Sequence, residues 1–214
     1  MKVVISGTSR GIGKAIALKF LAQNHEVTGF DLNEGTIDHP NYHHIQMDIR
    51  SNILPVLDCD ILINNAGTLD EEEALSINLL GTINFTNHFL KHNELKSILF
   101  LASASARNGA EFPNYCASKG GIVSYMKNLA LNLAKKGITV NSISPGGVMT
   151  ESNNHIINNP ILYKEVLDET LLNKWIDVDE LADLAYYLTV VNNSITGEDI
   201  LIDNGEMLKS NFIW

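Results

Sequence analysis

Short apolar runs alternate with longer amphipathic stretches along most of the 214-residue chain. The apolar runs end in polar or glycine-rich turns, as strands do when both faces of a parallel sheet are covered. The intervening stretches repeat apolar residues every three or four positions, which predicts helices. The pattern therefore predicts an α/β fold, a doubly wound parallel sheet of about seven strands with helices on both faces.

Seven apolar runs are predicted to form strands, at residues 2–6, 26–30, 42–47, 60–63, 98–102, 138–144 and 198–202. Helical patterns occupy residues 15–21, 70–90, 113–136 and 180–190. The crossover from Asp48 to Asp60 is too short for a full helix, and Pro55 interrupts it. Residues 151–174 are polar and then weakly amphipathic, which is typical of a mobile lid.

Composition narrows the function classes. The length and the 45% hydrophobic content suit one domain over residues 1–214. The net charge of −10 opposes binding to nucleic acid. No apolar stretch reaches the roughly 18 residues of a membrane span, so we expect no membrane partner. The N-terminal apolar run is too short for a signal peptide, so we expect a cytoplasmic protein. The two cysteines, Cys59 and Cys116, are too few for a disulfide framework. His88 and His92 lack a third metal ligand, so no metal site is predicted.

A glycine-rich turn follows the first predicted strand. Gly7, Gly11 and Gly13 are spaced G-x-x-x-G-x-G between that strand and the first helix. Absent side chains let a pyrophosphate approach the backbone N–H groups of a helix N-terminus, although the same glycines also suit a plain tight turn. Asp31 ends the second strand, 18 positions after Gly13, where a carboxylate accepts hydrogen bonds from adenosine ribose hydroxyls. The combination favours a dinucleotide site.

Further polar or small residues follow the later strands. The run 64–67, Asn-Asn-Ala-Gly, ends the fourth strand and leaves space beside a flat ligand. Ser103 follows the fifth strand, and the turn-forming run 145–150 follows the sixth. Ligands of a doubly wound sheet bind outside the carboxyl ends of its strands, so these residues are expected to face one crevice.

Tyr115 and Lys119 lie four residues apart at the start of a predicted helix, so their side chains share one face. A cation held near a phenol favours the phenolate and lowers its pKa from about 10, which would make Tyr115 an acid-base catalyst. Taken alone, the pair is also compatible with chance decoration of a helix. The crevice formed with Ser103 favours the catalytic interpretation.

Three helix features carry separate predictions. Acidic residues at 70–73 complement the dipole of the helix that they open, so they are assigned no function. Asn78 is costly inside a helix, which indicates a special role. Gly120 and Gly121 predict close packing in the helix over residues 113–136.

In their order and spacing, these motifs resemble those of the short-chain dehydrogenase/reductase family over nearly the whole chain. The resemblance implies a Rossmann-type fold and NAD(P)-linked interconversion of ketones and secondary alcohols. It implies that Tyr115 is the acid-base and that Ser103 polarises the substrate oxygen. Lys119 would bind the nicotinamide ribose and lower the pKa of Tyr115, and Asn78 would hold a water of the proton relay. The motifs that carry it are Gly7-x3-Gly11-Ile12-Gly13, Asp48, Asn64-Asn65-Ala66-Gly67, Asn78, Ser103, Tyr115-x3-Lys119, Asn141, Pro145-Gly146 and Thr150.

The resemblance also implies a cofactor site, in which two residues favour different cofactors. Asp31, with Glu34 nearby, accepts from the ribose hydroxyls of NAD and repels the 2′-phosphate of NADP. Arg10 occupies a position where the family often has a cation for that phosphate, although it also suits adenine stacking or an ion pair. We expect NAD to be preferred by about tenfold, with NADP possible. The implied cofactor-binding residues are Gly7, Ser9, Arg10, Gly11, Ile12, Gly13, Asp31, Asp48, Ile49, Asn65, Ala66, Gly67, Tyr115, Lys119, Pro145, Gly146, Val148 and Thr150.

Departures from the family pattern leave the substrate open. The segment from Gly67 to Asn78 is about half the expected length, and the gap from Ser103 to Tyr115 is one residue short, so Ser105 is a second assignment for the serine. The partner is expected to be a small carbonyl or alcohol. Two rival readings are a catalytically inactive NAD-sensing protein and an enoyl reductase, for which the resemblance expects a tyrosine and lysine seven residues apart.

A homo-oligomer, either a tetramer or a dimer, is also expected. The resemblance implies pairing through the helices that carry Asn78 and Tyr115. The apolar residues 212–214 need cover, which points the same way.

Overall fold

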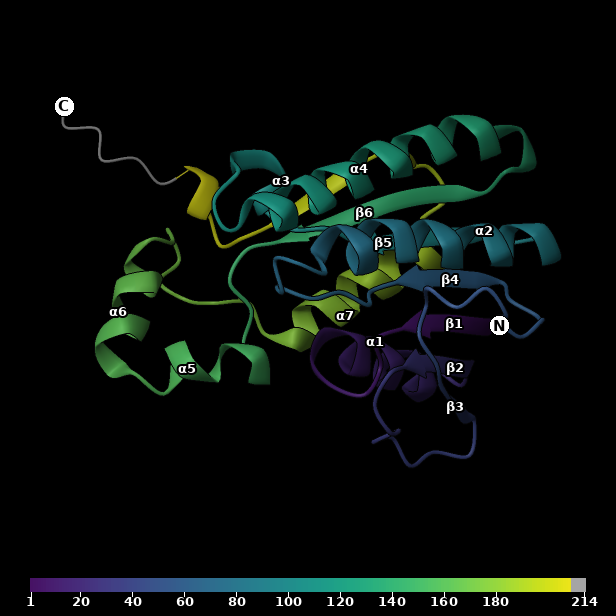
Figure 1. Ribbon diagram of the computed structural model, residues 1–214, viewed down its shortest axis with the longest axis horizontal. Coiled ribbons are helices and arrows are strands. Elements are labelled where there is room, and N and C mark those ends of the chain that lie inside the picture. Colours follow the sequence, from purple (N-terminus) through teal and green to yellow (C-terminus); the bar gives the residue numbers. More distant parts are fainter. Residues whose placement is uncertain (209–214) are drawn as a thin grey trace.

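A computed structural model describes residues 1–208, and the prediction for the tail at 212–214 lies outside these residues. Seven parallel strands form one sheet in the order β3-β2-β1-β4-β5-β6-β7 (Figure 1). The predicted fold class is confirmed, and each predicted strand boundary is within one residue of the observed one. The strands are β1 Lys2–Ser6, β2 Glu26–Asp31, β3 Tyr42–Gln46, β4 Ile61–Asn64, β5 Ser97–Leu101, β6 Thr139–Pro145 and β7 Asp199–Ile202.

Helices cover both faces of the sheet (Figure 1). On one face α1 and α7 pack together, and their buried residues join one core cluster. On the other face α2 and α4 bury Phe85, Phe89 and Met126 in a second cluster. The α-helices are α1 Gly11–Ala22, α2 Thr82–His92, α3 Ser105–Asn108, α4 Pro113–Leu133, α5 Asn154–Ile157, α6 Pro160–Asp168 and α7 Val178–Tyr186.

The strand order reverses between β1 and β4. From β1 the chain proceeds outward through β2 and β3, and it then returns to pair β4 with the other side of β1. The crossover from β3 to β4 contains no helix within the described chain, in agreement with the short spacing and Pro55. The connections that follow β1 and β4 therefore leave toward opposite sides of the sheet, which creates the crevice where such sheets bind ligands.

The long helix predicted over residues 70–90 is divided in two. It begins with the π-helix η1 Leu75–Gly81 and continues as α2. The wider π turn places Asn78 inside, where its side chain is fully buried and hydrogen-bonded. A second π turn, η4 Tyr187–Val191, ends the helix predicted over residues 180–190.

The predicted close packing of two glycines in α4 is half right. A Cβ on Gly121 would lie 2.8 Å from Cδ2 of Leu79, so this glycine allows the contact of α4 with η1. A Cβ on Gly120 would meet nothing within 4 Å. The packing of α4 at Gly120 therefore does not require a residue without a side chain.

Candidate active site

The glycine turn between β1 and α1 leaves no room for side chains. Gly7 and Gly11 have φ angles of +77° and +55°, in the left-handed region that favours glycine. A Cβ on Gly13 would lie 2.0 Å from the carbonyl oxygen of Gly7. The turn thus brings bare backbone to the N-terminus of the 12-residue helix α1, which is the arrangement that a pyrophosphate requires.

The end of β4 is hydrogen-bonded to this turn. The Asn65 side chain donates to the carbonyl oxygens of Ser6 and Gly7, at 3.1 and 2.9 Å. The backbone N–H groups of Asn65 and Ala66 both donate to Oγ of Ser6. Three of the predicted cofactor residues are therefore held together at the point where the strand order reverses.

Asp31 lies beside the same turn. Its Oδ2 accepts from the backbone N–H of Ser9 at 2.9 Å, and its Oδ1 accepts from the backbone and side chain of Asn33. Each carboxylate oxygen can accept two hydrogen bonds, so Oδ2 retains capacity for one more donor. The exposed Arg10 lies next to this group and makes no ion pair with any residue of the described chain.

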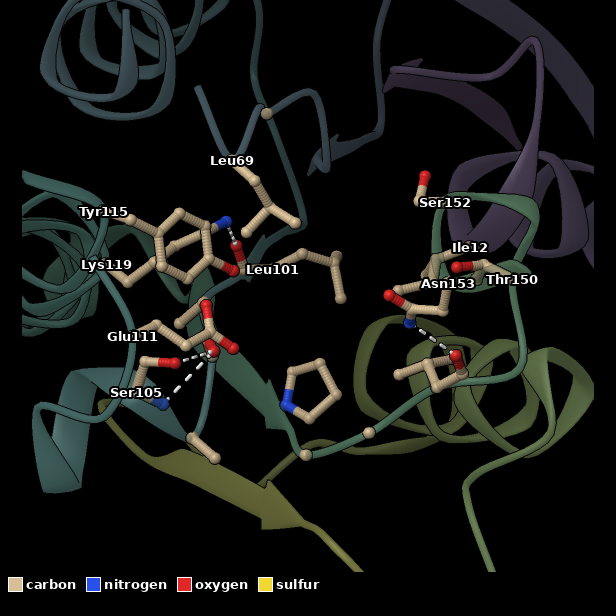
Figure 2. Close-up of a pocket in the computed structure, with 18 of the residues that line it drawn as sticks. Ile12, Leu69, Leu101, Ser105, Glu111, Tyr115, Lys119, Thr150, Ser152 and Asn153 are labelled. Carbon is tan, nitrogen blue, oxygen red and sulfur yellow. Dashed lines mark hydrogen bonds between the residues drawn. The ribbon is translucent and has the colours of Figure 1, made fainter. Parts of the chain in front are cut away.

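A cavity of about 790 Å³ opens in front of the strand ends (Figure 2). On one side Tyr115, Lys119 and Glu111 point into it, and on the other side Thr150, Ser152 and Asn153 face them (Figure 2). Its volume suits a cofactor end together with a small substrate. Ten of the predicted cofactor residues line it, namely Arg10, Ile12, Asn65, Gly67, Tyr115, Lys119, Pro145, Gly146, Val148 and Thr150.

The remaining predicted cofactor residues lie outside the cavity lining. Most of them belong to the glycine turn and its hydrogen-bonded neighbours, namely Gly7, Ser9, Gly11, Gly13, Asp31 and Ala66. Asp48 and the buried Ile49 follow β3 instead. The Asp48 carboxylate is bound by Arg50, whose guanidinium lowers the pKa of Asp48 and also pairs with Glu73. The structure thus assigns the Asp48 side chain to a link between this loop and the η1 segment.

Ser103, Tyr115 and Lys119 come together at the carboxyl end of β5. The Ser103 hydroxyl interacts with the phenol of Tyr115 and hydrogen-bonds Oγ of Ser105 at 3.0 Å. Lys119 is 6% exposed, and its Nζ donates to the carbonyl oxygen of Leu101 at 2.9 Å. Both candidate serines therefore line the cavity with Tyr115, and Ser103 is the one whose hydroxyl acts on the phenol.

The expected lowering of the Tyr115 pKa by Lys119 is wrong for the protein without a ligand. Burial raises the pKa of Tyr115 to about 12, and the hydrogen bond from Ser103 opposes this shift only in part. Burial also lowers the pKa of Lys119 to about 8. The ammonium lies 5.7 Å from the phenol ring centroid and bonds a carbonyl, so it does not offset the desolvation of the phenol.

The Asn78 side chain does not reach the cavity. Its Oδ1 accepts from the backbone N–H of Thr68 at 2.7 Å. Its Nδ2 donates to the Thr68 carbonyl oxygen and to Oγ of Ser118. The side chain thus fixes the η1 segment against the cavity loop and α4, and the role of Asn78 in holding a water of the proton relay stays a prediction.

The acidic run at residues 70–73 has a role that the sequence did not suggest. Oε1 of Glu71 accepts from the backbone N–H of Asn114 at 2.8 Å, and its Oε2 accepts from that of Tyr115 at 3.4 Å. Phe112, at the N-cap of α4, makes no side-chain cap. Glu71 thus caps the catalytic helix from the shortened segment, rather than serving only its own helix.

Sequence reasoning also missed Glu111, Glu206 and Trp175, which line the cavity. Glu111 lies between two predicted catalytic residues, and that position was the only available signal. Trp175 packs against Gly147, where a Cβ would lie 2.3 Å from its Nε1. The segment predicted as a lid supplies the short helices α5 and α6, which project beyond the carboxyl ends of the strands (Figure 1).

Residues 1–208 lack two further kinds of feature. No helix there combines the length and apolar character needed to cross a bilayer. No group of three histidine, cysteine, aspartate or glutamate side chains in that range is arranged to hold a metal ion.

The fold and the cavity define a nucleotide-binding oxidoreductase of the Rossmann type. Residues 55–206 match the family model described as "Enoyl-(Acyl carrier protein) reductase". The chain belongs to the short-chain dehydrogenase/reductase family, whose members transfer hydride with NAD(P).

Curated relatives cover nearly the whole chain. It is 28% identical to the 3-oxoacyl-(acyl-carrier-protein) reductase of Buchnera aphidicola, over 94% of this chain and 95% of the relative. It is 25% identical to the glucose 1-dehydrogenase of Gluconobacter oxydans, over 99% and 93%. A short-chain dehydrogenase family protein from Francisella tularensis has a similar structure, with a TM-score of 0.86 at 25% identity, over 97% of this chain and 99% of that one.

Proposed function

We propose that Tyr115 is the acid-base in the interconversion of a small ketone and its secondary alcohol. NAD(P) supplies or accepts the hydride when bound. The carrying observation is that Tyr115, Ser103 and the buried Lys119 line the same cavity, beside the carboxyl ends of the strands. In reduction the phenol donates its proton to the substrate oxygen, and the Ser103 hydroxyl hydrogen-bonds that oxygen as charge develops.

Lys119 has one task in this proposal. Its buried ammonium lines the cavity and is fixed by the Leu101 carbonyl oxygen, and it would bond a ribose hydroxyl of the cofactor. Gly7, Gly11 and Gly13 would receive the pyrophosphate, because their turn exposes backbone N–H groups at the start of α1.

The test is the substitution Tyr115→Phe, with Tyr125→Phe as the matched control. Tyr125 lies on the same helix, but its hydroxyl bonds Asn87 outside the cavity. We expect Tyr115→Phe to reduce kcat at least tenfold with little change in cofactor affinity, since only the transferable proton is lost. Retention of more than about a tenth of kcat would contradict the assignment.

Carbonyl chemistry is favoured over the reduction of C=C bonds. Tyr115 and Lys119 are four residues apart, whereas the enoyl reductase pattern expects seven. The inactive alternative predicts that a catalytic side chain is missing, but Ser103, Tyr115 and Lys119 are all present at the cavity. A panel of ketones, secondary alcohols and enoyl thioesters with both cofactors tests all three possibilities.

For the cofactor we propose a preference for NAD of about tenfold, equivalent to roughly 1.4 kcal/mol. The support is the position of Asp31 at the glycine turn, with one acceptor site left on Oδ2. Arg10 makes no ion pair within residues 1–208 and favours NADP, which is bound in a 24% identical structure described as a putative 2-deoxy-D-gluconate 3-dehydrogenase from Agrobacterium tumefaciens. Measuring kcat/KM with both cofactors for wild type, Asp31→Ala and Arg10→Ala separates the two contributions. Equal efficiencies in wild type would overturn the preference.

We also propose a homo-oligomer in the cytoplasm. Leu80 on η1 and Leu131 on α4 are 62% and 79% exposed, and pairing of these helices would cover them. Cys59 and Cys116 are free thiols, which fits a reducing compartment. A concentration-independent monomer mass in analytical ultracentrifugation would contradict the oligomer, and cell fractionation tests the location.

A further inference from the structure

Glu111 occupies a strained position in the cavity wall. Its φ angle is +107°, a left-handed value that disfavours every residue with a side chain. Glycine would adopt this conformation without strain. A glutamate here therefore works against the local backbone, and strained residues of this kind cluster at functional sites.

The Glu111 side chain points into the catalytic end of the cavity (Figure 2). There it lies beside Ser105, and it interacts electrostatically with both Tyr115 and Lys119. It forms no ion pair in the described part of the chain. The carboxylate thus lies among the groups that would surround a reacting carbon, with acceptor capacity left over.

Acidic side chains outnumber basic ones along the cavity. Partial burial of Glu111, and secondarily the proximity of Glu206, raises the pKa of Glu111, while Ser105 and Lys119 act in the opposite direction. Lys119 is committed to the Leu101 carbonyl. The charged residues of the lining are Arg10, Asp70, Glu111, Lys119, Glu169 and Glu206, four acids and two bases. The substrate end therefore disfavours an anionic group.

We propose that Glu111 determines substrate specificity by accepting a hydrogen bond from a donor on the carbon next to the reacting carbonyl or carbinol. The preferred substrates carry a hydroxyl or an ammonium group there, and substrates with a carboxylate at that position are rejected. This inference rests on the proposed carbonyl/alcohol chemistry, and it names the substrate class for that site.

Four secondary alcohols of the form CH3–CH(OH)–X test the proposal. They are 1,2-propanediol, 1-amino-2-propanol, 2-butanol and lactate, in which X is CH2OH, CH2NH3⁺, CH2CH3 and COO⁻. Each loses a hydride from the carbinol carbon to NAD⁺ and the hydroxyl proton to the enzyme, giving the ketone, NADH and a released proton. We expect kcat/KM for the diol and the amino alcohol to exceed that for 2-butanol at least tenfold, with lactate lowest.

Two variants at Glu111 and one control separate specificity from structure. Glu111→Gln should lower the ratio of amino alcohol to lactate at least tenfold. Glu111→Gly should lose the same discrimination while matching or exceeding the thermal stability of wild type, because it relieves the strained φ. The control is Glu72→Gln, an exposed residue outside the cavity, which should change neither property.

The binding of the four alcohols to the enzyme–NADH complex, followed by NADH fluorescence, provides a readout that does not need turnover. The same rank order in binding supports the proposal even where these small alcohols react slowly. An unchanged amino alcohol to lactate ratio in Glu111→Gln, or a loss of stability in Glu111→Gly, would overturn it. Failure of the carbonyl chemistry itself would instead be seen as undiminished activity in Tyr115→Phe.

Discussion

Replacing Lys119 by methionine should make the protein more stable at neutral pH while removing its activity. Burial lowers the pKa of Lys119 from 10.5 to about 8. A shift of this size means that the folded protein carries a penalty of about 3 kcal/mol for the charged lysine below pH 8. Methionine fills a similar volume without a charge, and it loses the hydrogen bond to Leu101, worth about 1 kcal/mol. The net gain is about 2 kcal/mol, or roughly 4–8 °C in Tm.

The stability difference between Lys119→Met and wild type should depend on pH, in a direction set by the lowered pKa of Lys119. Between about pH 8 and 10.5 the unfolded chain keeps the Lys119 proton and the folded chain does not, so wild-type stability rises with pH in that window. The variant lacks this rise, so its advantage should shrink from about 2 kcal/mol at pH 7 toward zero or below by about pH 9.5. Other titrating groups contribute equally to both proteins and cancel in the difference.

Urea denaturation followed by circular dichroism, at matched protein concentrations and both pH values, measures the difference. Lys127→Met is the control, because this lysine is exposed on the same helix. It should change stability by less than about 0.5 kcal/mol at either pH. A Lys119→Met protein that is less stable than wild type at pH 7, or whose advantage is the same at both pH values, would refute the reasoning.

Three further predictions follow from local geometry. Glu71→Ala should destabilise the protein by about 1–2 kcal/mol in urea titrations, because it removes the cap of α4. The same substitution at the exposed Glu72 should have little effect. Equal effects of the two substitutions would exclude the cap. Gly13→Ala should weaken NAD binding at least tenfold in calorimetric titrations, since the Cβ of the alanine would lie 2.0 Å from a backbone oxygen. Unchanged affinity would show that the turn adapts to the added side chain. Above about pH 10 the wild-type protein should lose stability that Tyr115→Phe retains. The reason is that the Tyr115 phenol ionises near pH 10 in the unfolded chain and near pH 12 in the folded one. Identical pH profiles of the two proteins in thermal melts would contradict the burial of this phenol.

The sheet and the glycine turn could be predicted because their signals are local. An apolar run bounded by turn residues specifies a strand without reference to its neighbours, and all seven strands were found in this way. The positions of Asp31, Ser103 and Asn65 at strand ends then followed from the geometry of a parallel sheet. Fold and crevice were therefore accessible from sequence.

Other features depend on contacts between distant segments. The capping of Asn114 by Glu71 joins residues that are 43 positions apart, and a charge run alone does not indicate which N–H group will donate to it. The π-helix around Asn78 requires partners in Thr68 and Ser118. No sequence rule indicates which side chains will be solvated, and desolvation is the largest cause of the unexpected pKa of Tyr115.

Glu111 was missed for a different reason. Sequence signals for a positive φ depend on glycine or asparagine, so a glutamate with φ of +107° gives none. It can be recognised only where the backbone is known.

The strand order also has a consequence for the order in which the chain can fold during synthesis. β1, β2 and β3 leave the ribosome first and can pair among themselves, but one edge of β1 must wait for β4, which begins at Ile61. Until then an apolar strand edge stays open to pairing with other nascent chains. Once β4 has docked, β5, β6 and β7 add outward one at a time, each beside the strand made just before it. The early wait at β1 is therefore a step at which this protein depends on protection from aggregation.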